Sequence, residues 1–372
     1  MSKSRSKYLL LRIPTVLSLL IITCCSSDEG DSSRLAIAEA KLEAISTFEP
    51  RTTEFEGFLG YPYDLDTDEN GNIYVLDQKE RRVVVLDSKF RFVRAIGREG
   101  QGPGEFTFSN LGADAHRLSV RNGLMAVDDS RQTVHLFQTD GTFLHRFRIN
   151  NDSITDIEIT PEGNILIAVL SQENSLWEYT QDGDEVRKYG LPLVQTGLNP
   201  FEHRWVFRYQ SANQCELEIL PDGKVITLGI FWPRLRIYED GILKSEADLD
   251  LSCLVEALPD ESSGLDEIIA VFEENPPEAI NEASRRGTLS EEYPGRPSMS
   301  LLMQFKEHEN RLWCQMGLYV LGVSLDGSLT SALRLIPDNA YSLGAHGFGF
   351  SGDQIIFSLP QSASLVHVKN PW

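Results

Sequence analysis

The stretch over residues 61–106 reads YPYDLDTDENGNIYVLDQKERRVVVLDSKFRFVRAIGREGQGPGEF, and weaker copies of it recur along the chain. It predicts four strands that are joined by tight polar turns and followed by a Gly-rich exit. Asn-Gly is a preferred pair for two-residue hairpin turns, and the segments IYVLD and RVVVLD are rich in residues that favour strands. A repeated four-stranded unit decides the architecture of the chain, but not its function.

The copies keep a regular spacing between two turn residues in each unit. The spacing is 17 to 20 residues, and the pairs are Gly71 and Lys89, Gly123 and Gly141, Gly163 and Gly183, Gly223 and Gly241, Asn310 and Gly327, and Gly352 and Asn370. Each pair flanks two strand-like segments. Six units of four antiparallel strands describe a six-bladed β-propeller. The sequence therefore predicts an all-β propeller over residues 47–372.

The sixth unit ends after its third strand, SLVHVK, and needs an outer strand from elsewhere. Residues 47–56, TFEPRTTEFE, precede the first unit and contain strand-forming residues. We expect this N-terminal segment to complete the sixth blade and close the ring, because closure removes the exposed sheet edges that invite aggregation.

The first unit resembles the NHL-type six-bladed propellers, in particular the bacterial six-bladed β-propeller lipoproteins. The residues that carry the resemblance are Tyr61-Pro62, 70–77 (NGNIYVLD), 82–87 (RVVVLD) and 96–106 (IGREGQGPGEF). It is strongest in blade one and weakest in blades five and six. The resemblance implies the architecture of most of residues 47–372 and carries no shared catalytic motif.

The N-terminus has the layout of a secretory signal peptide. Four basic residues precede an apolar run over 13–22, which is too short to span a bilayer. The sequence IITC resembles a bacterial lipobox, although Thr23 departs from the usual residue before the acylated cysteine. We expect cleavage after residues 1–23 and acylation of Cys24. Cys25 is a second candidate, and an ordinary cleaved signal is the alternative. Both lipidation readings imply secretion across the inner membrane and lipid anchoring in the bacterial envelope, at the outer membrane or facing the periplasm.

Residues 24–46 are expected to form a lipidated tether, because SSDEGDSS at its start is too polar to fold. Residues 1–23 carry four basic and no acidic side chains, so their removal changes the formal charge from −21 to −25. Such a domain repels phosphate backbones and anionic lipid surfaces. We expect a monomer with no nucleic-acid partner, which meets the membrane through its lipid anchor only. An envelope protein or a small ligand stays open as its partner.

Three cysteines follow the leader, Cys215, Cys253 and Cys314. They show no CxxC spacing, so neither a zinc site nor a disulfide framework is indicated. Three separate thiols are favoured over one disulfide.

Two insertions interrupt the repeat. In the smaller one, between blades three and four, Arg204, Trp205 and Arg208 fall in an alternating segment. This segment reads either as the first strand of blade four or as part of a ligand platform. The larger insertion, 252–297, separates blades four and five and has helical periodicity. It is expected to cover an apolar patch on the propeller, or alternatively to form a lid over the channel mouth.

The segment DTDENG matches the opening of a calcium loop, with Asp66, Asp68 and Asn70 as oxygen ligands. Its flanks alternate as strands, which excludes an EF-hand. The carboxylate that a propeller calcium hairpin adds three residues after the Gly is replaced by Tyr74. A plain hairpin turn is therefore favoured, with calcium kept as the alternative and no other cofactor predicted.

These observations favour an envelope lipoprotein whose propeller binds a ligand or scaffolds a protein. The alternative is a metal-dependent propeller enzyme of lyase or lactonase type, with its site at the channel mouth. That chemistry needs several metal ligands, whereas the seven histidines are scattered without ligand spacing. His346, before the sixth blade, is the best single candidate for the mouth. Whether the protein is an enzyme stays open, with a binding role favoured.

Overall fold

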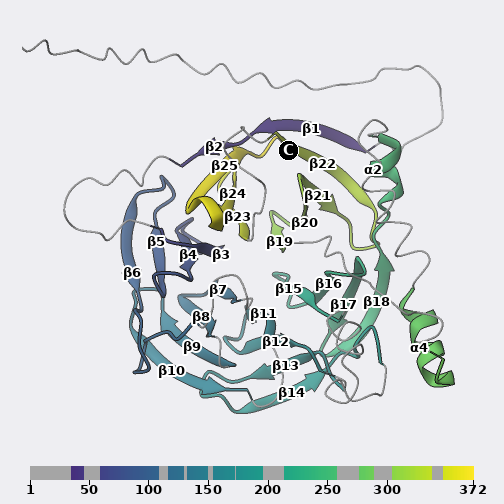
Figure 1. Cartoon of the computed structure of the whole chain (residues 1–372), viewed down its shortest axis with the longest axis horizontal. Coiled ribbons are helices and arrows are strands. Elements are labelled where there is room, and N and C mark those ends of the chain that lie inside the picture. The colour runs from purple at the N-terminus through teal and green to yellow at the C-terminus, as the bar shows by residue number, and fades with distance from the viewer. Residues whose placement is uncertain are drawn as a thin grey trace, which may run out of the picture.

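Six sheets form a ring around a central channel, as Figure 1 shows. The structure is a computed structural model, and it describes residues 35–45, 59–108, 116–129, 132–149, 154–171, 173–195, 213–257, 276–288, 304–336 and 347–372. Each sheet contains one blade of antiparallel strands that run outward from the channel in sequence order. The predicted six-bladed propeller is confirmed.

The strands of the first three blades follow the turn spacing of the sequence. Blade one contains β3 (Pro62–Thr67), β4 (Ile73–Asp77), β5 (Arg82–Leu86) and β6 (Phe92–Ile96). Blade two contains β7 (Leu118–Arg121), β8 (Leu124–Asp129), β9 (Thr133–Gln138) and β10 (Phe143–Arg148). Blade three contains β11 (Ile154–Ile159), β12 (Ile165–Val169), β13 (Leu176–Tyr179) and β14 (Glu185–Tyr189).

The last three blades are built in the same way. Blade four contains β15 (Cys215–Ile219), β16 (Val225–Gly229), β17 (Arg234–Glu239) and β18 (Ile242–Asp248). Blade five contains β19 (Gln304–His308), β20 (Arg311–Met316), β21 (Tyr319–Val323) and β22 (Leu329–Ile336). Blade six contains β23 (Gly347–Ser351), β24 (Gln354–Leu359), the short 3-10 helix η4 (Pro360–Ser362) and β25 (Ser364–Lys369).

The N-terminal part of the chain closes the ring, but with a different segment from the predicted one. Strand β2 (Glu43–Ala44) pairs antiparallel with β25 and completes blade six. Strand β1 (Ala36–Lys41) pairs in parallel with β22 and adds a fifth strand to blade five. Closure by an N-terminal strand is confirmed. Its predicted position at 47–56 is wrong, and those residues lie outside the described part of the chain.

The same strands also correct the predicted tether, since 36–44 belong to the propeller rim (Figure 1). The physical reason is that β22 and β25 would otherwise leave unpaired backbone groups at the outer edges of their blades. An extended segment can pair with such an edge whatever its composition. Ala38 and Leu42 are buried among blades five and six, and Ile45 is buried between blades six and one.

Hydrophobic clusters lie at all six interfaces between neighbouring blades. They form because the middle strands carry near-continuous apolar runs, such as RVVVL in β5 and ILIAV in β12, and are covered by a blade on each side. At the closing interface, Leu65 of blade one packs with Ile356 of blade six. Burial of one such side chain contributes about 1.5–3 kcal/mol. The interfaces therefore hold the ring together and fix the inner strands around the channel.

The larger insertion contains two described helices, α2 (Ser252–Ala257) and α4 (Pro277–Arg286), which lie outside the ring in Figure 1. Gly287 ends α4 in a left-handed conformation at φ 76°, which favours glycine. Ile280 and Ala283 pack against Leu193 and Trp232. Helix α4 thus covers an apolar patch on the rim and does not lie over the channel. The residues between α2 and α4 are outside the described part.

The three cysteines of the propeller are free thiols, as favoured by their spacing. Cys215 and Cys314 are buried, and Cys253 is partly buried.

Candidate functional site

Polar side chains from the inner strands fill the channel in two layers. Residues i and i+2 of a strand point to the same side, so the inner strands of blades one, three, four and five each present one side chain to each layer. In blade two the two side chains, Arg117 and Arg121, are four positions apart. We call the layer nearer the β3–β4 turn the mouth tier, which consists of Asp66, Arg121, Glu158, Glu218 and Lys306. We call the layer below it the inner tier, which consists of Asp64, Arg117, Asp156, Glu216 and Gln304. Blade six presents only Gly347 and Gly349.

Carboxylates of both tiers connect neighbouring blades. Four of the six carboxylates each accept a hydrogen bond from the backbone N–H of their own following residue and another from the inner strand of the next blade. The pairs of donors are Leu65 and Leu118 for Asp64, Thr67 and Val120 for Asp66, Ile157 and Leu217 for Asp156, and Ile219 and Glu307 for Glu218, at 2.7–3.1 Å. Inner strands are sheet edges with unpaired N–H groups. These carboxylates satisfy them and stabilise the ring.

The polar side chains of the inner tier are hydrogen-bonded to one another and to the backbone of neighbouring blades. Arg117 donates to Glu216 at 2.7 Å and to the carbonyl of Thr155 at 3.0 Å, and its Nε lies 3.6 Å from Asp156. Burial opposes the charge of Arg117, but the surrounding carboxylates outweigh it and raise the pKa of this guanidinium. Gln304 donates to Asp64 at 2.5 Å and accepts from Phe348 N–H at 2.6 Å. The inner tier is therefore structural.

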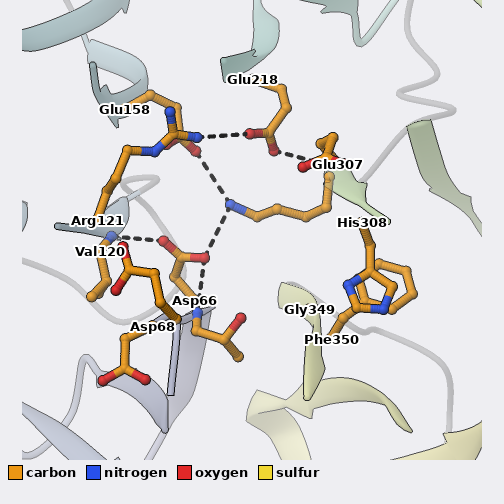
Figure 2. A pocket seen from close by; sticks show the side chains of 13 residues that line it. Asp66, Asp68, Val120, Arg121, Glu158, Glu218, Glu307, His308, Gly349 and Phe350 are labelled. Atoms are coloured by element: carbon orange, nitrogen blue, oxygen red, sulfur yellow. Dashed lines mark hydrogen bonds and ion pairs between the residues drawn. The ribbon is translucent and has the colours of Figure 1, made fainter. Parts of the chain in front are cut away.

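The charged side chains of the mouth tier lie farther apart than those of the inner tier, and they border a cavity of about 210 Å³. The ammonium of Lys306 lies 3.4 Å from Glu158 and 3.8 Å from Asp66, and Arg121 lies 3.8 Å from Glu218. Figure 2 shows Asp66, Arg121, Glu158 and Glu218, from four different blades, around one space, which Lys306 also lines. Charge-assisted hydrogen bonds between nitrogen and oxygen are usually 2.7–2.9 Å long. The mouth tier therefore keeps hydrogen-bonding capacity that the inner tier has used.

Burial changes the protonation of the mouth tier. It raises the pKa of Glu218 to about 8, and the neighbouring charge of Glu158 acts in the same direction. It raises the pKa of Glu158 to about 7, against the opposing effect of Lys306. Burial alone would lower the pKa of Lys306, but Asp66, Glu158 and Glu218 raise it well above its ordinary value. At neutral pH the tier combines a charged ammonium with carboxyl groups that are partly protonated.

An aromatic wall borders the cavity opposite the mouth tier. The rings of His308 and Phe350 stack with centroids 4.2 Å apart and an angle of 6° between their planes (Figure 2). Burial lowers the pKa of His308, so its ring is uncharged at neutral pH. A Cβ at Gly349 would lie 2.6 Å from Leu65 Cδ1. Glycine there lets blade six approach blade one and leaves this side of the cavity without a polar side chain.

The structure accounts for the calcium-like segment as a hairpin turn. Asp68 accepts hydrogen bonds from the N–H groups of Asn70 and Asn72 at 2.9 Å, and Gly71 adopts φ 75°. Asp66 belongs to the mouth tier instead. The predicted hairpin is confirmed. Among the described residues, no group of three or more His, Cys, Asp or Glu side chains could hold a metal ion.

The other predicted site residues lie outside the described part of the chain, namely Cys24, Arg204, Trp205, Arg208 and His346. The first strand of blade four begins at Cys215.

The sequence interpretation missed the mouth tier and the wall residue His308. A signal for the tier was present in the first strand of several blades. YDLD, TDIEI and CELEI place acidic residues at i and i+2 between apolar ones, and QFKEH does the same with Gln304 and Lys306. A strand that is covered by blades on both sides needs a reason for polar residues at alternating positions. In this ring the reason is the channel.

Comparisons with known proteins find a family model and several solved structures that are similar to this chain. A family model described as a 6-bladed beta-propeller matches residues 50–111. A virginiamycin B lyase from Staphylococcus aureus is 11% identical, with 89% of this chain and 88% of that chain covered and a TM-score of 0.47. A gluconolactonase from Xanthomonas campestris is 10% identical, with 89% and 94% covered and a TM-score of 0.46. A putative exported protein from Bacteroides fragilis is 12% identical, with 90% and 99% covered and a TM-score of 0.46.

A search among curated proteins finds no significant match. The chain is a six-bladed β-propeller, as its repeats predict. Likeness at this level of identity carries no activity over to the chain, because one fold hosts many functions.

Proposed function

We propose that this protein is an envelope-anchored propeller that binds a small polar ligand at the mouth of its channel. The observation that carries the proposal is the cavity of about 210 Å³ among the mouth tier and the aromatic wall. A concave site with a few convergent polar groups and shifted pKa values is the usual form of a ligand site.

The contrast between the two tiers supports binding over a purely structural role. Carboxylates of both tiers connect the blades, but none of the inner-tier residues lines the cavity, whereas all five mouth-tier residues do. In the mouth tier, Arg121 donates to the carbonyl of Ile219 at 2.7 Å. A guanidinium has five N–H donors, and no further hydrogen bond joins Arg121 to the described residues. A ligand in the cavity can use the remaining donors.

The anchoring part of the proposal comes from the leader. Its basic start, its short apolar run and the IITC sequence support acylation at Cys24 and attachment to the bacterial envelope. No helix among the described residues is long and apolar enough to cross a membrane. Fatty-acid labelling of the full chain in a bacterial host tests this part. Cys24→Ser should abolish labelling and membrane retention, whereas Cys25→Ser should preserve both. Labelling that survives Cys24→Ser would overturn the assignment.

The binding part is tested by a thermal-shift screen of the purified chain from residue 25 onward against a library of small polar metabolites. His308→Ala removes the outer ring of the aromatic wall. His145→Ala is the matched control, because His145 is exposed on the outer strand β10. We expect compounds that stabilise the wild type and the control but not His308→Ala. Compounds that stabilise all three proteins equally, or a screen without any stabilising compound, would overturn binding at the mouth.

A further inference from the structure

We infer that the ligand of the channel mouth is an uncharged polyhydroxyl compound of the saccharide class. This inference rests on the proposed binding function and names the chemistry of its ligand. Three features of the cavity lead to it: the balance of its charges, the order of its donors and acceptors, and its flat aromatic wall.

The charges of the mouth tier nearly cancel at neutral pH. Three carboxyl groups face two cations, and Glu218, with a pKa of about 8, holds its proton at pH 7 for most of the time. A charged ligand would leave one fixed charge in excess in a buried site, which is costly.

The rim of the cavity adds to this selection. Asp68, Glu69 and Glu307 also line the cavity and repel anions, while a cationic amine would have to lie beside Lys306 and Arg121. An uncharged ligand avoids both penalties.

Donors and acceptors are interleaved around the cavity. The ammonium of Lys306 lies between Glu158 and Asp66 at 3.4 and 3.8 Å, and Arg121 lies beside Glu218 at 3.8 Å. The contact of Lys306 with Glu158 is a long hydrogen bond, and the other two pairs are too far apart for one. A hydroxyl group both donates and accepts hydrogen bonds, so it can lie beside such a pair, accepting from the cation and donating to the carboxylate. A ligand with several adjacent hydroxyls matches several of these pairs at once.

The wall and the volume fit one sugar ring. His308 is partly exposed, uncharged at neutral pH and stacked on the buried Phe350. Its flat ring offers an apolar surface for the C–H face of a pyranose. The volume of about 210 Å³ lies below the roughly 300–1,000 Å³ of sites for drug-sized ligands. The cavity therefore suits a single ring, or the terminal ring of a longer chain that extends into solvent.

The test compares matched sugars that differ only in charge. Glucose, galactose and mannose are each titrated beside the corresponding uronate and amino sugar, by ligand-observed NMR at pH 7 with the chain from residue 25 onward. We expect the neutral member of at least one set to bind, and its charged partners to bind about tenfold or more weakly. His308→Ala and Arg121→Lys should each weaken the neutral sugar by about tenfold, which corresponds to about 1.4 kcal/mol. His145→Ala should leave binding unchanged. Circular dichroism confirms the folding of each variant, and Arg121→Lys keeps the test valid if His308→Ala unfolds.

The outcomes separate this inference from the proposed function. Tighter binding of a uronate or an amino sugar would overturn the inference, while binding at the mouth would stand. The same holds if no sugar binds but another compound from the metabolite screen requires His308. If neither sugars nor metabolites bind, the proposed function fails and the inference fails with it.

Discussion

The substitution Glu218→Gln tests the electrostatics of the mouth tier through stability. Glu218 is buried, and burial raises its pKa from the ordinary 4.5 to about 8. Between these two values the folded protein holds a proton that the unfolded chain has already released. The stability that this group contributes is therefore fully present below about pH 4.5 and is lost as the pH rises towards 8.

The size of the effect follows from proton linkage. Each pH unit inside this window costs about 1.4 kcal/mol, so Glu218 can remove at most about 4 kcal/mol between pH 5 and pH 8. Gln does not titrate, so the variant does not lose this stability as the pH rises. Glu218 accepts hydrogen bonds from the backbone N–H groups of Ile219 and Glu307, one on each carboxylate oxygen. Because Gln has only one side-chain oxygen, one of these N–H groups loses its acceptor in the variant. That cost, about 1–3 kcal/mol, is the same at every pH.

The measurement is the free energy of unfolding in urea at pH 5, 6, 7 and 8. We expect the difference between variant and wild type to move by about 2–4 kcal/mol in favour of the variant from pH 5 to pH 8. Other buried carboxyls titrate in both proteins and largely cancel in the difference. Glu162→Gln, in an exposed turn of blade three, is the control and should show no such change. Parallel pH curves for wild type and Glu218→Gln would refute the reasoning.

Three further predictions concern ring closure, blade packing and metal. A chain that begins at residue 46 lacks β1 and β2 and with them the buried Leu42 and Ile45. Its free energy of unfolding should be at least about 3 kcal/mol lower than that of a chain that begins at residue 35. Equal urea midpoints of the two chains would contradict closure by these strands. Gly349→Ala places a Cβ 2.6 Å from Leu65 Cδ1 and should cost about 1–3 kcal/mol in thermal or urea unfolding, so an unchanged midpoint would argue against close contact of blades six and one. Metal analysis of the purified protein should find no stoichiometric zinc or calcium, and a chelator should leave the melting temperature unchanged. Stoichiometric metal whose removal lowers that temperature would instead support the metal-dependent enzyme.

The blades were predictable because their signals are local. A turn such as Asn70-Gly71 and an alternating strand such as 73–77 act within a few residues, and six repetitions fix their register. The N-terminal strands β1 and β2 gave no such local signal. Residues 36–41 read AIAEAK, and Ala, Glu and Lys are depleted in strands. This segment is extended because the edge of β22 is available, which only the assembled ring determines.

The mouth tier was not predictable as a site for a related reason. Its members come from inner strands of separate blades, and Lys306 and Glu158 are 148 positions apart in the chain. The tier also contains no histidine or cysteine, the residues whose spacing signals a metal site in a sequence. The acidic pairs at i and i+2 were visible in the sequence, but only the ring shows that they share one channel.

The central claim is that an uncharged sugar binds among the side chains of the mouth tier. A crystal structure of the protein soaked with the sugar that binds most tightly in the NMR titrations tests it most directly. We predict one sugar ring in the cavity, with hydroxyls hydrogen-bonded to Arg121 and Glu218 and one face against His308. A sugar bound elsewhere on the propeller, with the cavity unchanged, would contradict the claim.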